Sequence, residues 1–314
     1  MRVRKHVLLA IVVAAAVAGV ASRAPAQGEL VNQARRLDLE GKQEPAIVLY
    51  QQALDLAPDS FDAHYGIARA LDLVGRYEEA RRHFARAIEL APEGVKDQAL
   101  RMMGVSWAFT GNAGEAATFF RQVFDRDVAA GNFVAAAEVA NELGRVYVEL
   151  DHLDDGYRWY RIGYQTSTRQ RHRPASEIDL SKLRWAHAQG RIAARKGNAR
   201  EAWRHAATVK QLLDKGTNSD QRIQYPYLVG YIHFYLKQPK DAIAALQNAD
   251  QGDPFIVVLL AQAHEEMGNS ALARQYYEKA LASNSHAVNN AFARRLARQR
   301  LGPPNVPPRG SGAK

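Results

Sequence analysis

Apolar and polar positions repeat along the chain with a period of 34 residues near its start. Residues 41–58, GKQEPAIVLYQQALDLAP, and residues 75–92, GRYEEARRHFARAIELAP, place Gly, Ala, an aromatic residue, Ala and Ala-Pro in the same register. Within each copy the apolar residues recur at the spacing of one face of an α-helix. The pattern therefore predicts an amphipathic helix in each copy, with another helix between the copies.

The same frame continues to about residue 287 and predicts seven pairs of antiparallel helices. A small residue stands where the two helices of a pair meet, so that their backbones can approach closely. These small residues are Ala34, Ala68, Gly104, Gly144, Gly190, Gly230 and Ala261 in the first helices, and Ala46, Ala80, Ala116, Gly156, Ala202, Ala242 and Ala273 in the second helices. One pair cannot bury its apolar faces alone, whereas a stack of pairs can.

In this frame the chain resembles the tetratricopeptide repeat (TPR) family. The family pattern of small, apolar and aromatic residues is matched by Ile67, Ala68, Leu71, Ala80, Phe84, Ala87 and Pro92, and by Leu143, Gly144 and Tyr147. The resemblance covers nearly all of residues 27–287. It implies an all-α fold, namely a right-handed superhelical α-solenoid of about seven helix-turn-helix repeats with a C-terminal capping helix.

Departures from the frame predict how the chain is divided. Repeats 1–4 are expected in residues 27–170 and repeats 5–7 in residues 183–287, with a basic junction at 171–182 between them. The segment 166–177, TSTRQRHRPASE, is polar and basic, and we expect a long loop there. An amphipathic segment at 288–301 predicts the capping helix. The Pro- and Gly-rich residues 302–314 have little to bury, which predicts a disordered tail.

The first 26 residues have the pattern of a secretory signal peptide. A basic opening, MRVRKH, precedes the apolar run VLLAIVVAAAVAGVA and the small-residue site SRAPAQ. We expect cleavage after Ala26, with Ala21 as the alternative, and hence a protein of the periplasm or the extracellular space. An uncleaved anchor is the other interpretation, although the run is shorter than the roughly 20 residues of a spanning helix. The chain has no cysteine, so disulfides and a lipidated N-terminal cysteine are excluded.

Known catalytic patterns find little support in this sequence. There is no thiol nucleophile, no Gly-rich phosphate loop and no pair of histidines at metal-ligand spacing. His264 and Glu265 lie in AHEEMGN, where the second ligand of a zinc-protease motif would fall at Gly268. We therefore predict a protein that is not an enzyme and has no catalytic residue, metal site or cofactor.

Binding is expected on the face formed by the first helices, because the resemblance implies that these helices line a concave groove. Carried over by repeat position, the predicted contact residues are Arg35, Tyr65, Arg69, Arg101, Asn141, Arg145, His187, Arg191, Tyr227, Tyr231 and Tyr235. Arginine pairs with carboxylates through two parallel N–H groups, and tyrosine offers a flat apolar area with a polar tip. This combination favours an extended, acidic segment of a partner protein. In the alternative interpretation, the arginines pair with acids of adjacent helices, such as Asp62, Glu138 and Glu142.

Two other kinds of partner remain open at this point. Tyr65, Trp107 and the tyrosines of repeat 6 could stack on sugar rings, as in a carbohydrate or cell-wall binding module. The formal net charge falls from +9 to +5 without the four basic residues of the signal peptide, and Arg169, Arg171, Arg173 and the arginines of the cap could instead bind anionic surfaces. Nucleic acid is not expected as a partner of an exported protein, nor is a stable membrane span after signal cleavage. The sequence does not indicate the oligomeric state.

Overall fold

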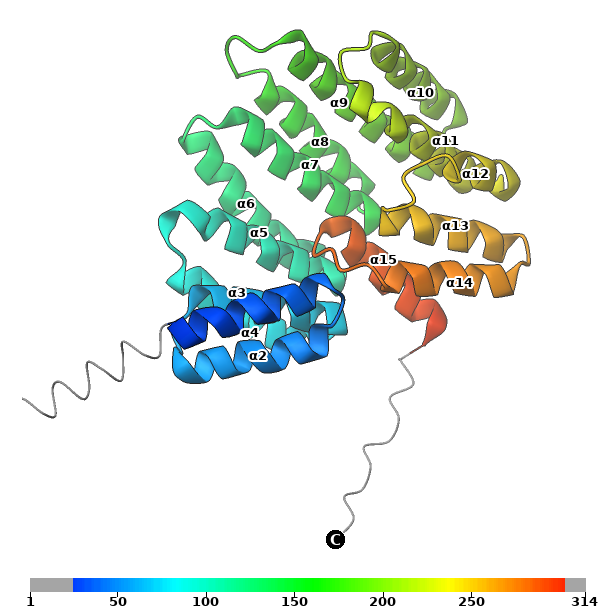
Figure 1. Cartoon of the computed structure of the whole chain (residues 1–314). Helices are drawn as coiled ribbons and strands as arrows, with labels where there is room; N and C mark the ends of the chain where they lie inside the picture. Colours follow the sequence, from blue (N-terminus) through cyan, green and yellow to red (C-terminus); the bar gives the residue numbers. More distant parts are fainter. Residues whose placement is uncertain (1–24, 303–314) are drawn as a thin grey trace, which may run out of the picture. The chain divides into compact units, whose positions relative to one another are not determined.

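The computed structural model of the chain describes residues 25–302, and its regular elements in this range are all helical (Figure 1). A first helix covers residues 25–39. It is followed by α2 (Gln43–Leu56), α3 (Phe61–Val74), α4 (Tyr77–Leu90), α5 (Glu93–Phe109), α6 (Ala113–Ala129), α7 (Phe133–Glu149), α8 (Leu153–Ser167), α9 (Ala175–Arg195), α10 (Ala199–Asp214), the short 3₁₀ helix η1 (Ser219–Ile223), α11 (Gln224–Tyr235), α12 (Pro239–Leu246), α13 (Pro254–Glu266), α14 (Ser270–Leu281) and α15 (Val288–Leu301). The predicted all-α fold of helix-turn-helix repeats is confirmed.

The described residues divide into two compact units, 25–106 and 107–302. The division lies inside α5, between Ser106 and Trp107, and not at the junction predicted for residues 171–182. At that junction the loop is shorter than predicted, because α8 continues to Ser167 and α9 begins at Ala175. Helices α8 and α9 pack against each other, so the second unit continues through this loop.

In the first unit, capping residues in the sequence mark the beginning and the end of α3. Ser60 precedes α3, and its hydroxyl accepts a hydrogen bond from the backbone N–H of Ala63 at 3.3 Å. Gly75 follows α3 with a φ of 93°, a left-handed conformation that glycine adopts at low cost. The small residues predicted at the crossing points, Ala46, Ala68 and Ala80, are fully buried. Local sequence signals thus set the helix pairs of this unit.

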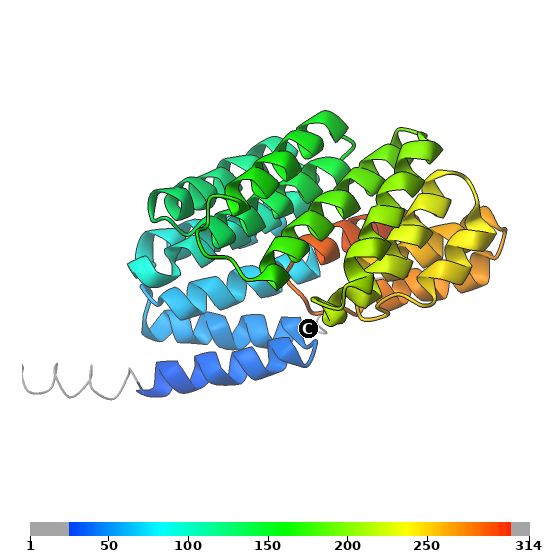
Figure 2. The same cartoon turned by 90° about the horizontal axis from the view of Figure 1, so that it is seen from above.

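In the second unit, consecutive helices pack side by side as antiparallel neighbours (Figure 2). Gly144 of α7 shows why the repeat requires a small residue, because a Cβ atom added there would lie 2.8 Å from the ring of Tyr160 on α8. Gly230 of α11 stands in the same relation to Leu246 of α12, at 2.5 Å. The bulky residue of each second helix therefore occupies the space that the small residue leaves free.

Helix α15 spans the residues predicted for a capping helix and lies between α7 and the pair α13–α14. It packs against α13, α14 and α7. Its apolar residues Val288, Ala291, Phe292, Ala293 and Ala297 are buried. The predicted signal peptide and the predicted disordered tail lie outside the described residues, apart from residues 25, 26 and 302. Among the helices of residues 25–302, none is both long and apolar enough to span a bilayer.

Candidate functional site

The predicted groove residues of the first unit lie on the 25–39 helix, α3 and α5. Arg35 is exposed and forms an ion pair with Asp62 at 3.3 Å, as the alternative interpretation of the arginines has it. Tyr65 is half-buried beside Phe61, and its hydroxyl accepts a hydrogen bond from Gln98 at 3.0 Å. Two further predicted residues, Arg69 and Arg101, are half-buried. Burial raises the pKa of Tyr65, so its hydroxyl is neutral at physiological pH.

The predicted residues of the second unit converge on a carboxylate that the sequence analysis did not select. Glu149, the last residue of α7, has a side chain that is 2% exposed. Its two carboxylate oxygens pair with Arg191 at 3.2 Å and with Arg195 at 3.0 Å, both from α9. The hydroxyl of Tyr231, from α11, donates to the same carboxylate at 3.3 Å. Three helices are therefore tied together through one buried acid.

Arg191 illustrates how completely this network satisfies a buried charge. A second nitrogen of its guanidinium donates to the hydroxyl of Tyr160, whose ring the guanidinium also covers. Burial by itself would lower the pKa of Arg191. The oxygen atoms of Tyr160, Tyr227 and Glu149 that face it nevertheless hold this pKa well above the ordinary value. Arg191 is therefore a cation inside the unit.

Arg145 lies one helical turn before Glu149 on α7 and is surrounded by aromatic rings. Its guanidinium carbon is 4.7 Å from the ring centre of Phe255 on α13 and 5.7 Å from that of Tyr227 on α11. One of its terminal nitrogens donates to the Tyr227 hydroxyl at 3.0 Å. The ring centre of His187 lies 5.3 Å from that of Tyr227. Burial, and then the charges of Arg191 and Arg145, hold the pKa of His187 well below its usual range.

These contacts change the interpretation of the predicted groove. His187, Arg191, Tyr227 and Tyr231 are at most 8% exposed. They are held among α7, α9, α11 and α13, so they form the interior of the unit and not an open contact surface. The same burial removes the flat faces on which Tyr227 and Tyr231 were expected to stack sugar rings. Of the predicted residues in this unit, Asn141, Arg145 and Tyr235 remain half-buried.

The residues that complete the network, Glu149, Arg195 and Tyr160, were missed by sequence reasoning. A signal for two of them was present. Glu149 follows Arg145 by four residues, and Arg195 follows Arg191 by four residues, which places each pair on one face of its helix. The alternative interpretation looked for acids at Glu138 and Glu142 instead. Glu138 does pair with an arginine, but with Arg184, at 3.4 Å.

An open notch lies nearer the N-terminal ends of α7 and α9. It is lined by Val134, Ala137, Glu138, Asn141, Gly163, Tyr164, Ser167, Arg173, Glu177, Leu180, Ser181, Arg184 and Trp185. It encloses about 60 Å³, which is room for part of one side chain and not for a whole cofactor. Asn141 is the predicted contact residue that this notch contains. We name it the α7–α9 notch.

The α7–α9 notch combines aromatic and charged side chains. Trp185 and Tyr164 stack with their rings 6.2 Å apart at an angle of 14°. Arg173, from the loop before α9, is fixed by hydrogen bonds to the Ser167 carbonyl at 2.8 Å and to the Ser181 hydroxyl at 2.7 Å. The pair of Arg184 and Glu138 is about half exposed at the edge. An apolar side chain flanked by polar groups would match this arrangement.

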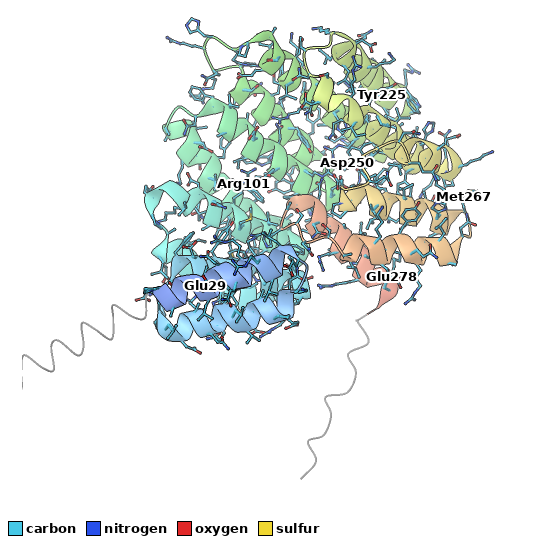
Figure 3. All side chains as sticks on the ribbon, in the orientation of Figure 1. Glu29, Arg101, Tyr225, Asp250, Met267 and Glu278 are labelled. Atoms are coloured by element: carbon cyan, nitrogen blue, oxygen red, sulfur yellow. The ribbon has the colours of Figure 1, made fainter. Side chains whose placement is uncertain are left out.

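Groups of histidine and carboxylate side chains arranged to hold a metal ion do not occur within residues 25–302. Figure 3 shows how densely side chains occupy the helix surfaces of this range, with Tyr225 on α11 and Asp250 in the turn after α12 among those labelled. The predicted contact residues of the second unit thus lie in two polar features, the notch and the buried network. Neither presents a nucleophile beside a general base.

Comparison with known proteins supports the repeat interpretation. Models of the tetratricopeptide repeat match residues 40–102 and residues 256–286. Among solved structures, the apo form of RapI aligns with a TM-score of 0.55 and 13% identity, over 87% of this chain and 99% of RapI. A tetratricopeptide repeat protein from Parabacteroides merdae aligns with a TM-score of 0.52 and 12% identity, over 88% of this chain and 98% of its own.

A third structure, aspartyl phosphate phosphatase F from Bacillus subtilis, aligns with a TM-score of 0.55 and 12% identity. The alignment covers 79% of this chain and 67% of that protein. At such identities the likeness shows a shared fold and leaves activity open. Among curated protein sequences, no significant match to this chain is found.

Proposed function

The chain is a tetratricopeptide repeat protein, and we propose that it acts as a non-catalytic interaction module that binds a partner protein in the α7–α9 notch. The observation that carries the proposal is the stacked pair of Trp185 and Tyr164, which remains partly exposed beside charged groups of both signs. Aromatic residues in a small pocket with a polar rim are typical of the residues that dominate protein interfaces.

The dimensions of the notch favour an extended segment over a small molecule. It has room for part of one apolar side chain, while Asn141, Arg184 and Glu138 offer donors and acceptors to the backbone on either side. Because Arg173 is held by three hydrogen bonds to neighbouring groups, the notch keeps its shape without a partner. A preformed site of this kind costs little ordering on binding.

We place this interaction in the cell envelope, on the strength of the signal-peptide pattern in residues 1–26. The role that follows is that of an adaptor which holds an exported partner. Carbohydrate binding is less favoured, because Tyr227 and Tyr231 lack exposed faces. Anionic-surface binding is weakened too, since Arg169 covers the ring of Phe133 at 4.2 Å and Arg173 is bound within the loop.

A crosslinking experiment tests the notch directly. A photoreactive amino acid is placed at Val134, which lines the notch and is 41% exposed, and in a second protein at Met267, which is 46% exposed and lies elsewhere. Both proteins are irradiated in envelope extracts and the crosslinked products are identified by mass spectrometry. We expect a partner that crosslinks from position 134 and not from position 267.

The purified partner then provides a quantitative check. Arg184→Glu should weaken its binding at least about tenfold, which corresponds to about 1.4 kcal/mol. Arg158→Glu is the matched control, because Arg158 also forms an exposed ion pair, with Asp155 at 3.2 Å, but lies outside the notch. Equal affinities for the two variants, or the same products from both crosslinking positions, would overturn the proposal.

A further inference from the structure

The buried network of the second unit contains more positive than negative charge. Arg145, Arg191 and Arg195 contribute three guanidinium groups to it, whereas Glu149 is the one buried carboxylate among the described groups around them. The other acid nearby, Asp151, pairs with Arg195 at 3.3 Å from a side chain that is 79% exposed. Arg145 forms no ion pair among the described contacts. A cation excess therefore remains around Arg145 and Arg191.

The same region holds polar atoms that are buried and lack a hydrogen-bond partner within the described part of the chain. They are the Nε atoms of Arg145 and Arg191 and the Nε2 atom of His187. His187 and Arg145 both lie near the ring of Tyr227, and Arg191 lies one turn beyond His187 on α9. A buried polar atom without a partner costs free energy, and a bound ion or water is one way to satisfy it.

The aromatic rings compensate only part of this cost. Phe255 and Tyr227 cover Arg145, and Tyr160 and Tyr231 cover Arg191, so the faces of both guanidiniums are stabilised by cation–π contacts. The N–H groups at the edges of a guanidinium require acceptors in its plane, which a ring face does not provide. An oxygen anion would satisfy the edges and neutralise the excess charge together.

We propose that Arg145, His187 and Arg191 form a binding site for an oxyanion, a carboxylate or phosphate group, beside Tyr227. The guanidinium of Arg145, which lies against the rings of Phe255 and Tyr227, would donate to the anion. His187 is 8% exposed and Arg191 is 3% exposed, so both would hold the anion away from water. In such surroundings a charge-assisted hydrogen bond is stronger than at the surface.

The position of this site suggests where the oxyanion comes from. Asn141 and Arg184 of the α7–α9 notch precede Arg145 and His187 by about one turn on the same two helices, which is roughly 5–6 Å along the axis. An acidic side chain of a docked segment could reach it, in which case this role rests on the proposed function. A free inorganic anion is the other source. The chemistry of recognition is the same for both.

Thermal unfolding of the purified protein tests the site without any knowledge of the partner. Inorganic phosphate and glutarate are added separately, with sodium chloride at matched ionic strength as the reference. We expect the melting temperature to rise with at least one of the two anions and the rise to saturate. Saturation with phosphate alone would identify a free anion as the ligand, and saturation with glutarate alone would identify a carboxylate. If the melting temperature rises with neither anion, the proposal is overturned.

Two substitutions connect the effect to the site. Arg145→Gln should lower the association constant at least about tenfold, while Arg145→Lys, which keeps the charge, should lose less. Arg69→Gln is the control, since Arg69 is half-buried at the equivalent repeat position in the first unit. The melting temperature without anion is a second, independent measurement. We expect that of Arg145→Gln to be no lower than that of the unsubstituted protein, because an uncompensated charge has been removed.

Unchanged anion binding by Arg145→Gln would overturn the proposal, and so would a loss of binding equally large in Arg69→Gln. The result is independent of the crosslinking at Val134. A failed search for a partner would leave saturable phosphate binding intact, and absent anion binding would leave the notch intact.

Discussion

Glu149 and Arg191 form an ion pair at 3.2 Å in which the two side chains are 2% and 3% exposed. They come from different repeats, α7 and α9, and Arg195 and Tyr231 join them. A pair this deeply buried costs desolvation, and its benefit depends on keeping both partners. It therefore acts as a fixed connection among three repeats.

The substitution Glu149→Gln tests this connection. The new amide would keep a carbonyl oxygen for Tyr231 but would leave Arg191 and Arg195 without their buried countercharge. We expect the free energy of unfolding to fall by about 3–5 kcal/mol, measured by urea denaturation. Glu138→Gln, which removes an exposed pair with Arg184, should cost less than about 1 kcal/mol. Equal losses in the two variants would show that burial does not govern the pair.

A second prediction concerns the histidine pair of the first unit. The Nδ1 atoms of His64 and His83 lie 2.9 Å apart, and His64 Nε2 is 2.9 Å from the Pro58 carbonyl, to which it must donate. His64 Nδ1 is then the acceptor, and His83 donates to it. Burial, followed by the charges of His64 and Arg82, lowers the pKa of His83 to about 4.

The sign of the pH effect follows from this pKa. Between about pH 6.5 and pH 4 the unfolded chain binds a proton at His83 that the folded chain does not, so stability falls as the pH falls through this window. His83→Gln should flatten the slope of unfolding free energy against pH in urea titrations. Gln51→Ala, a change in the same cleft between α2 and α4, should leave the slope unchanged. A slope that persists in His83→Gln would contradict the assignment.

The third prediction tests why the repeat keeps glycine on α7. In Gly144→Ala the new methyl group would lie 2.8 Å from the Tyr160 ring, and this ring is also covered by the guanidinium of Arg191. We expect a loss of about 1–3 kcal/mol from overpacking, measured by urea denaturation. Gly94→Ala on α5 is the control, because nothing lies within 4 Å of its added Cβ. That variant should be neutral or more stable by up to about 1 kcal/mol, since alanine favours helix.

The relation of Gly144 to Tyr160 also shows what the sequence could predict. Both residues belong to one helix pair, so a local frame of small and bulky positions was enough to identify them. The environment of Arg191 was different. Its repeat position indicated the face of α9 on which it lies, but not that Tyr231, from the following repeat pair, and Glu149, from the preceding one, would cover that face.

The burial of Tyr227 and Tyr231 has the same physical explanation. Tyr227 reaches Arg145 across 82 positions of sequence, because α7 and α11 are brought together by the accumulated arrangement of several pairs. Small differences in each pair add up along a stack, and no local periodicity records their sum. The α7–α9 notch was missed for a related reason: Trp185 and Tyr164 come from different repeats, and only their packing produces the cleft.

The last prediction concerns the attachment of the capping helix α15. Asp253 has two tasks, because one carboxylate oxygen accepts from the Phe255 backbone N–H at 2.8 Å and caps α13, while the other accepts from the Asn289 side chain on α15. Asp253→Ala should cost about 2 kcal/mol, of which about 1 kcal/mol is the cap. Asn289→Ala removes only the link and should cost about 1 kcal/mol.

A double-mutant cycle separates the two contributions. If Asp253 holds α15 through Asn289, the double variant should be no less stable than Asp253→Ala alone, because the link is lost once. Unfolding is followed by urea denaturation. Fully additive losses would mean that the two side chains act independently, and that the capping helix is held by its other contacts, such as the buried Val288 and Phe292 and the ion pair of Arg300 with Glu265 at 3.3 Å.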